Sequence, residues 1–473
     1  MAQVDPRSRG ISGIESRSID FVPTGERHGK SWHQGPFWFT GGFVLPSMLI
    51  GFIGPSMGLG LVWTLIAVVA GMAFGTLFMA LHANQGPRLG LPQMIQSRAQ
   101  FGARGAMFPM LVAVFIYIGY NVFQFILSGE ALDVVLPGGK IWYVVLAVVA
   151  TIIAVYGHDM LHTFQRWSSY VIVVVFAVFT VVAIVHFSGG HTHASAHFAF
   201  AAFLAQFAAA GGYQISYAIY VSDYSRYLPE RISARGLIAW TFFGATAGAA
   251  WLGCLGALLS SYITGADPIV ALHTVGNGFF PGFGVLCVLA TLPPMIGTSG
   301  VNAYGAMLTG ATIVDGIRHV RPGKQLRVVG LLVVGLAAQL ISVLMPADYL
   351  GSFNTFLVIM VYCLVPWTAV NLMDFYVVRR GNYSIKDIVD PNGRYGQWAW
   401  RGLVAYFSGF VAMIPFFSLS FYVGPVTKAL GGADISFVVG LAVSGVVYLL
   451  LNRQRMEEPV PVELAADPAI VTT

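Results

Sequence analysis

Long apolar runs recur along almost the whole chain and are separated by shorter polar segments. A helix needs about 20 predominantly apolar residues to cross the roughly 30 Å hydrocarbon core of a bilayer. Twelve stretches are of this kind: residues 37–58, 59–81, 107–133, 142–156, 168–187, 198–222, 237–263, 283–313, 328–345, 352–378, 402–422 and 435–451. The pattern predicts an all-α integral membrane protein with twelve transmembrane helices.

Lysine and arginine lie almost entirely on alternate sides of these runs. If the chain crosses the bilayer at every run, 23 of the 25 fall on the side of the N-terminus, and only Lys140 and Lys428 fall on the other. Because short loops retain positive charge in the cytoplasm, we expect an inner (plasma) membrane protein with both termini cytoplasmic. The net charge of +5 is then explained by topology, and nucleic acid is not an expected partner.

Two polar tails flank the runs. Residues 1–35 and 453–473 lack apolar periodicity and carry Ser, Gly, Pro and charge. Such composition is typical of disordered segments, so we expect disordered cytoplasmic tails.

Glycine pairs interrupt two of the runs. Gly41-Gly42 is followed by Pro46 in the first run, and Gly211-Gly212 is followed by Tyr213 in the sixth. Unwound backbone inside a bilayer is tolerated where it lines a cavity, and corresponding breaks in two halves of a transporter indicate its binding site. The alternative is close helix packing, which small residues also permit.

Acidic residues lie near the ends of the runs rather than at their middles. Because a charge inside the membrane is costly and usually functional, this distribution favours a neutral solute. The acidic residues concerned are Glu130, Asp133, Asp223, Asp315 and Asp374.

Uncharged polar side chains in the third and eighth runs suit such a solute. A carboxamide presents a donor and an acceptor side by side, which matches the edge of a flat heterocycle, and aromatic faces stack on its ring. The alternative is that these groups tie neighbouring helices together. The candidates are Tyr120, Asn121 and Gln124 in the third run and Thr298, Ser299 and Asn302 in the eighth.

Enzymatic and metal chemistry find no support in the sequence. His191, His193 and His197 share one loop, but a metal site needs three or four ligands in a fixed geometry. The three cysteines lie inside apolar runs at no metal-ligand spacing. We find no phosphate-binding glycine loop, no HExxH and no nucleophile elbow, so neither an enzyme nor a bound cofactor is expected.

Three loop segments carry a family resemblance: GPRLGLPQMIQSRAQFG at residues 86–102, SDYSRYLP at 222–229 and DFYVVRRGNY at 374–383. They resemble the nucleobase:cation symporter-1 family, which contains the purine-cytosine permeases and their hydantoin and allantoin relatives. The resemblance implies a LeuT-like fold with a five-plus-five inverted repeat and two C-terminal helices, working by alternating access. It divides a transporter domain, residues 36–452, into repeats at about 37–187 and 198–378 and extra helices at about 402–451.

The resemblance also implies roles for individual residues. The family's stacking aromatic falls on Tyr120 and its hydrogen-bonding glutamine on Gln124. Its glycine-aromatic pair at the broken sixth helix falls on Gly212 and Tyr213.

The eighth run departs from the family's pattern at two places. Relatives often show an Asn-Asn pair where this chain has Thr298-Ser299, so the bound base differs or is met through Asn302 or water. Sodium-coupled relatives use two adjacent hydroxyls, and the aligned positions here are Pro293-Pro294, which supply no side-chain oxygen.

A cation site would then rest on main-chain carbonyls of residues such as Gly41, Val44 and Ala290. A hard cation is better served by more oxygens. Proton coupling is therefore supported at least as well as sodium coupling, and the choice between H⁺ and Na⁺ stays open. Glu130 is a candidate proton carrier; the alternative is a solvated residue at a helix end.

We expect a secondary active transporter that imports a neutral nucleobase, cytosine or a purine. The ring would stack between Tyr120 and Tyr213 while Gln124 and the eighth-run cluster contact its edge. Within the same family, hydantoin, allantoin or a pyrimidine vitamin precursor is the alternative substrate, and a passive channel is the alternative mechanism. A monomer is the expected form.

Overall fold

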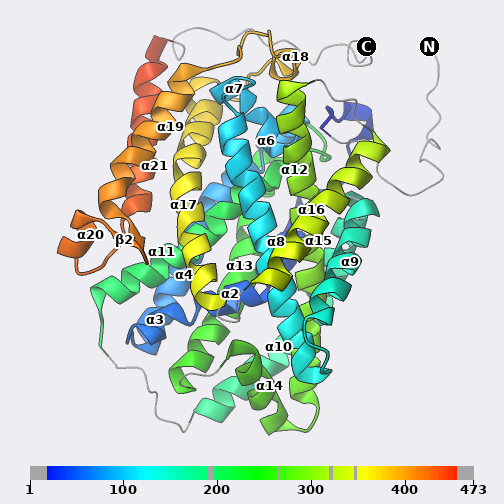
Figure 1. Cartoon of the computed structure of the whole chain (residues 1–473), viewed down its shortest axis with the longest axis vertical. Helices are drawn as coiled ribbons and strands as arrows, with labels where there is room; N and C mark the ends of the chain where they lie inside the picture. Colours follow the sequence, from blue (N-terminus) through cyan, green and yellow to red (C-terminus); the bar gives the residue numbers. More distant parts are fainter. Residues whose placement is uncertain are drawn as a thin grey trace.

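The computed structural model describes residues 19–156, 158–188, 197–263, 267–318, 323–345 and 349–454. Each of the twelve predicted runs contains a helix, and most of these helices lie side by side in one bundle (Figure 1). They are α1 (Gln34–Gly42) with α2 (Leu45–Ile50), α4 (Leu61–His82), α8 (Met107–Val135), α9 (Ile141–Tyr156), α10 (His158–Phe187), α11 (Phe200–Ser216), α13 (Ala234–Tyr262), α15 (Phe283–Ile317), α16 (Lys324–Leu344), α17 (Tyr349–Met373), α19 (Trp400–Met413) and α21 (Ser436–Leu451).

Length and hydropathy agree with a membrane location. In the part of the chain that the structure describes, seven helices are long and apolar enough to cross a bilayer, and the bent pair Ser31–Gly42 and Leu45–Ser56 makes an eighth span. Ile141–Tyr156, Trp400–Phe416 and Ser436–Leu451 are shorter apolar helices.

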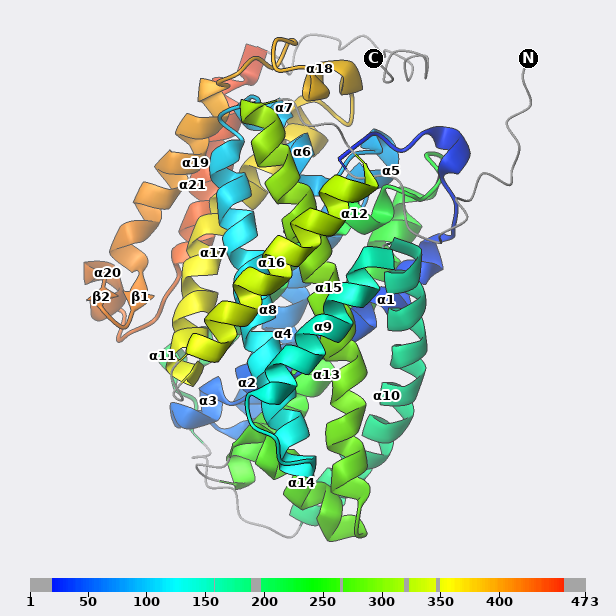
Figure 2. The ribbon, with the colours of Figure 1, turned by 45° about the vertical axis from the view of Figure 1, so that its right-hand side comes forward.

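Short elements close both ends of the bundle. One end, called the α18 end below, carries α5 (Gln85–Leu89), α6 (Gln93–Gln96), α7 (Arg98–Phe101), α12 (Val221–Ser225) and α18 (Ile385–Val389) (Figures 1 and 2). The opposite end carries α14 (Pro268–Phe279). Further short elements are α3 (Ile53–Ser56), α20 (Pro425–Ala429), the 3₁₀ turns Thr24–Glu26, Ser31–His33, Tyr217–Ile219 and Ile414–Phe416, and the π turn Asp374–Val378.

The all-α fold class is confirmed, but the predicted end of the eleventh run is wrong. The eleventh run was expected to be helical to residue 422, but the helix ends in the 3₁₀ turn Ile414–Phe416. Strands β1 (Ser418–Leu419) and β2 (Tyr422–Val423) then form a small antiparallel hairpin. Pro415 in that turn has no backbone N–H to continue a helix, and β-branched and aromatic residues such as Val423 favour strands.

Helix contacts follow a symmetric pattern. Helix α1 packs on α13, and α11 packs on α4, so the first and sixth spans each contact the second span of the other half. In the same way α9 packs on α15 and α16 on α8, and α10 packs on α15 and α17 on α8. Exchanging each span with the one five later preserves these contacts, as an inverted repeat requires. Helices α19 and α21 pack on each other and on α17, at one side of the bundle (Figure 1).

Glycines allow α4 and α11 to approach closely. A Cβ added at Gly75 would lie 2.0 Å from the main-chain oxygen of Gly211, and one added at Gly71 would lie 2.4 Å from that of Phe207. Small residues at such crossings let helix backbones meet inside a membrane.

Gly75→Ala is therefore expected to destabilise the protein by about 1–3 kcal/mol, because the methyl group would collide with backbone that cannot rotate away. The apparent melting temperature of detergent-purified protein measures this. Gly310→Ala in α15 is the matched control, since its added Cβ meets nothing within 4 Å. Equal losses for the two variants would contradict the packing explanation.

The first predicted break is confirmed. Helix α1 ends at Gly42, Phe43 and Val44 leave helical geometry with ψ of 66° and 153°, and α2 begins at Leu45 with Pro46 in its first turn. The two halves are bent by 62°.

The predicted position of the second break is wrong. Helix α11 continues through Gly211 and Gly212 to Ser216, and regularity is lost only in the turn Tyr217–Ile219 that precedes α12. Gly212 is instead a packing residue, because a Cβ there would lie 2.1 Å from Cγ2 of Val361 on α17. The alternative interpretation, close packing, is correct for this glycine pair.

The expected N-terminal tail is ordered from residue 19 onward. Val22 is fully buried and donates its N–H to the oxygen of Gly90 at 2.9 Å. The guanidinium of Arg27 donates to the oxygens of Val22 and Pro87. These bonds tie residues 19–35 to the loop around α5, which composition alone does not predict. Residues 1–18 and 455–473 lie outside the described residues.

Candidate functional site

The predicted site residues meet in the interior of the bundle. Helices α8, α11 and α15 carry the predicted substrate-binding residues, and none of the seven side chains named next is more than 2% exposed. The buried side chains are those of Tyr120, Asn121, Gln124, Tyr213, Thr298, Ser299 and Asn302. The site is thus closed to both ends of the bundle in this conformation.

Three tyrosines link α8, the third span, to the irregular segments of the first and sixth spans. The hydroxyl of Tyr217, in the irregular part of the sixth span, donates to the oxygen of Gly41 at 3.0 Å, and Tyr213 is hydrogen-bonded to Tyr217 at 2.9 Å. Tyr120 of α8 lies 2.7 Å from Oγ of Ser216. Hydrogen bonds therefore join both breaks to Tyr120, Tyr213 and Tyr217.

The rings of Tyr120 and Tyr213 stand edge to face. Their centroids are 6.0 Å apart with an interplanar angle of 82°. A flat base between parallel rings needs about 7 Å, twice the usual carbon contact distance. The structure brings the two predicted rings together, and stacking a base between them requires one ring to turn. Phe356 of α17 contributes a third ring, 5.3 Å from Tyr120.

Carboxamide and hydroxyl groups join α8 to α15. Oγ of Ser299 donates to Oε1 of Gln124 at 3.0 Å, and Nδ2 of Asn302 donates to Oδ1 of Asn121 at 3.0 Å. The structure thus brings these four predicted residues together, and in this conformation they also tie the helices. Nδ2 of Asn121 is buried without a hydrogen-bond partner among the described residues. A buried donor of this kind is costly, so a bound acceptor would stabilise it.

Thr298 faces a different neighbour. Its Oγ1 accepts from Nε2 of Gln165 on α10 at 3.2 Å and donates to the oxygen of Pro294 at 2.8 Å. The main-chain oxygen of Gln165 in turn accepts from Thr40 of α1 at 2.8 Å. Thr298 therefore belongs to a polar contact among α1, α10 and α15, apart from the tyrosines.

Sequence reasoning missed Ser216, Tyr217 and Gln165. Tyr217 follows Tyr213 by one helical turn, and that spacing was an available signal. Gln165 carries no such signal, because its role depends on the approach of α10 to α1 and α15.

Two of the three main-chain oxygens predicted to bind a cation already accept hydrogen bonds within the protein. The oxygen of Gly41 accepts from Tyr217, and that of Val44 accepts from the N–H of Ser47 at 2.8 Å. Ala290 lacks its helical donor because Pro294 has no N–H. With no hydroxyl at either proline, these residues fit a sodium ion poorly.

Metal-ligating side chains do not gather at one place in the described residues. Within them no group of three or more His, Cys, Asp or Glu side chains is placed to hold a metal ion. His191 and His193 lie outside the described residues.

A membrane bundle with symmetric helix contacts, a broken first span and a closed uncharged site defines a membrane transport protein. The family described as permease for cytosine/purines, uracil, thiamine, allantoin matches residues 21–440. The putative purine-cytosine permease YxlA of Bacillus subtilis is 34% identical over 459 residues, which cover 94% of this chain and 97% of that protein. The allantoin permease of Bacillus subtilis is 23% identical over 477 residues, covering 92% of each chain.

Solved structures agree on the fold. The transporter Mhp1, in a closed conformation with bromovinylhydantoin bound, matches with a TM-score of 0.76 at 17% identity, covering 96% of this chain and 98% of that one. Its inward-facing structure matches with a TM-score of 0.68. The chain belongs to the nucleobase:cation symporter-1 family of permeases. It is a LeuT-like multi-pass membrane transporter of small heterocycles and not an enzyme.

Proposed function

We propose that this transporter imports a neutral nucleobase, cytosine or a purine, by cation-coupled alternating access. The observation that carries the proposal is the buried Nδ2 of Asn121, which has no hydrogen-bond partner in the described part of the chain and lies on α8 with Gln124 and Tyr120. A ring nitrogen or carbonyl of a base supplies the missing acceptor, and the aromatic faces suit its ring. The purine-cytosine permeases among the relatives support the same substrate class.

The inner route in this proposal runs along α1 and α12. Trp38 lies edge to face with both Tyr217 and Tyr224, with centroids 6.2 Å and 6.1 Å away, and Phe37 stacks on His162 at 4.1 Å. A pocket of about 330 Å³, lined in part by His162 and Tyr224, lies beyond these rings. Release of the base requires α1 and α12 to separate, which parts the ring contacts and connects the site with this pocket.

We favour the proton as the coupling ion because few oxygen atoms are available to bind a sodium ion. The main-chain oxygens of Gly41 and Val44 at the first break already accept hydrogen bonds from within the protein, and Pro293-Pro294 offers no hydroxyl. Glu130, the candidate carrier on α8, accepts a hydrogen bond from the hydroxyl of Tyr143. Sodium is the competing ion.

Both termini are proposed to be cytoplasmic, since 23 of the 25 lysines and arginines fall on the side of the N-terminus in the predicted topology. A fluorescent-protein fusion at the C-terminus tests this, because it folds and fluoresces only on the cytoplasmic side of a bacterial inner membrane. A dark fusion with intact expression would contradict the orientation. The monomer remains the expected form and is tested by light scattering in detergent.

Uptake into proteoliposomes tests the function. Radiolabelled cytosine and hypoxanthine are expected to accumulate above equilibrium when a proton gradient is imposed, and a proton uncoupler should abolish accumulation. Accumulation driven by sodium alone would assign the other ion, whereas equilibration without accumulation under either gradient indicates a channel. Stronger competition by hydantoin or allantoin than by any nucleobase would assign the alternative substrate.

A further inference from the structure

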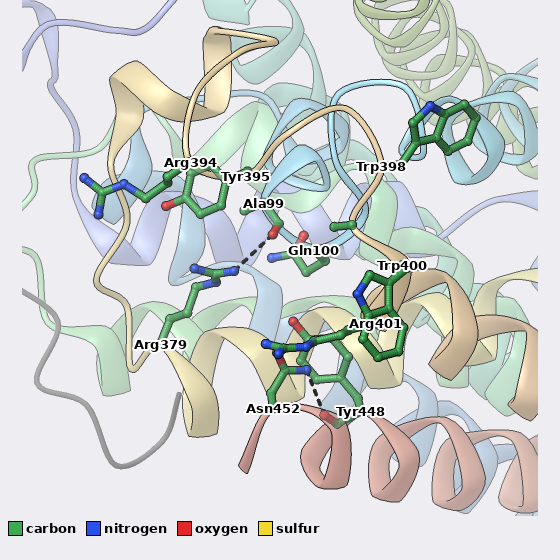
Figure 3. Close-up of a pocket in the computed structure, with 11 residues that line it drawn as sticks. Ala99, Gln100, Arg379, Arg394, Tyr395, Trp398, Trp400, Arg401, Tyr448 and Asn452 are labelled. Carbon is green, nitrogen blue, oxygen red and sulfur yellow. Dashed lines mark hydrogen bonds between the residues drawn. The ribbon is translucent and has the colours of Figure 1, made fainter. Parts of the chain in front are cut away.

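A second polar pocket lies at the α18 end of the bundle. Its volume is about 220 Å³, and Figure 3 shows the side chains that line it. They come from α7, the turn after α17, the segment between α18 and α19, the start of α19 and the end of α21. The pocket is smaller than the roughly 300–1,000 Å³ that encloses a drug-sized ligand, and suits the polar part of a larger molecule.

The indoles of Trp398 and Trp400 indicate at which level of the membrane the pocket lies. Their side chains are 62% and 57% exposed. Tryptophan is enriched where a transmembrane protein meets the lipid headgroups. Since α19 and α21 form one side of the bundle, we place the pocket at the headgroup level of the leaflet at the α18 end (Figure 1).

One of three arginines in the pocket is left without a compensating charge. Arg379 is neutralised by Asp374 through bonds of 3.0 and 2.9 Å, and Arg394 forms an ion pair with Asp387. Among the described residues Arg401 has no acidic partner and only covers the ring of Trp400, with its guanidinium carbon 5.7 Å from the centroid. The pocket therefore presents a positive charge beside the indole of Trp400.

The floor of the pocket carries an unsatisfied acceptor. Gln100 is 3% exposed, and its Nε2 is held by Asp374 at 2.7 Å. That bond fixes the orientation of the amide, because a carboxylate accepts only from the NH₂ group. Oε1 of Gln100 is left buried with no hydrogen-bond partner among the described residues. A buried acceptor in this state is stabilised by a ligand that donates a hydrogen bond.

We propose that this pocket binds the phosphodiester headgroup of a membrane phospholipid that carries a hydroxyl or ammonium donor. The phosphate lies on Arg401, the headgroup donor reaches Oε1 of Gln100, and the indoles cover the glycerol. The acyl chains follow α19, whose exposed Val404 and Phe407 continue from the pocket. Basic pockets between helices at the cytoplasmic face are typical sites for lipid headgroups.

Lipid titration of the full-length protein tests the proposal. Delipidated protein in detergent is titrated with dioleoylphosphatidylglycerol, and its binding is followed by native mass spectrometry and by the apparent melting temperature. Arg401→Gln is expected to raise the half-saturating lipid concentration about tenfold, because a charge-assisted hydrogen bond is lost. Arg401→Lys should recover part of the affinity. Arg231→Gln, at an exposed arginine outside the pocket, is the matched control and should bind normally.

Further measurements distinguish lipid binding from binding of free phosphate and from loss of folding. Glycerol 3-phosphate at the same concentration is expected not to compete, and dioleoylglycerol without phosphate is expected not to bind. Trp398→Ala, at an exposed indole, should weaken lipid binding about threefold without affecting folding. Equal losses for Arg401→Gln and Arg231→Gln would overturn the proposal, and so would full competition by glycerol 3-phosphate.

Discussion

Asp374→Ala is expected to lower the free energy of unfolding by about 3–5 kcal/mol, since it would leave the guanidinium of Arg379 buried without its counter-ion. Asp374 is fully buried and accepts from Gln100 at 2.7 Å and from Tyr383 and Tyr448 at 2.8 Å each, besides the two bonds from Arg379. One carboxylate thus joins the loop before α8, the turn after α17 and the end of α21. The apparent melting temperature in detergent, without substrate, should fall steeply.

The matched control is Asp387→Ala. Asp387 also pairs with an arginine, but the side chains of that pair are 43% and 20% exposed. Exposed ion pairs contribute about 0–1 kcal/mol, so this variant should melt close to the parent protein. The double variant Asp374→Ala with Arg379→Gln should recover stability relative to Asp374→Ala alone, because it removes the stranded charge. A double variant as unstable as the sum of two large single losses would contradict this explanation.

Gln124→Ala is expected to weaken nucleobase binding by about 1–3 kcal/mol, or roughly 5- to 150-fold in dissociation constant, if the amide contacts the edge of the ligand. The fold should survive. Ser299, its partner at 3.0 Å, keeps a second bond to the oxygen of Met295 at 2.9 Å. Isothermal titration of purified protein with cytosine or hypoxanthine measures the affinity.

Ser128→Ala is the control for this change. Ser128 lies one helical turn after Gln124 on α8, is 2% exposed, and bonds only to the main-chain oxygen of Gln124 among the described residues. Its removal should leave affinity unchanged. If Gln124→Ala also binds normally, the amide serves only to tie α8 to α15 and does not belong to the substrate site.

The third and eighth runs illustrate how far sequence reasoning reached. Side-chain chemistry placed Tyr120, Asn121 and Gln124 of the third run in one candidate site, and the structure has all three buried against α11 and α15. The same reasoning grouped Thr298 with Ser299, although Thr298 bonds to Gln165 of α10. Adjacent residues on a helix point about 100° apart, so which neighbour each one meets depends on helices that pattern does not position.

The sequence by itself determined the order of the apolar helices, the alternation of positive charge and the first break, because hydropathy, charge and the segment from Gly41-Gly42 to Pro46 act locally along the chain. Only the tertiary structure decided that the sixth span breaks at Tyr217–Ile219 rather than at Gly211-Gly212. There, the approach of α4 and Val361 holds the glycines in a helix. It also decided the pocket around Arg401, since that pocket joins segments that only the packing of α17, α19 and α21 brings together.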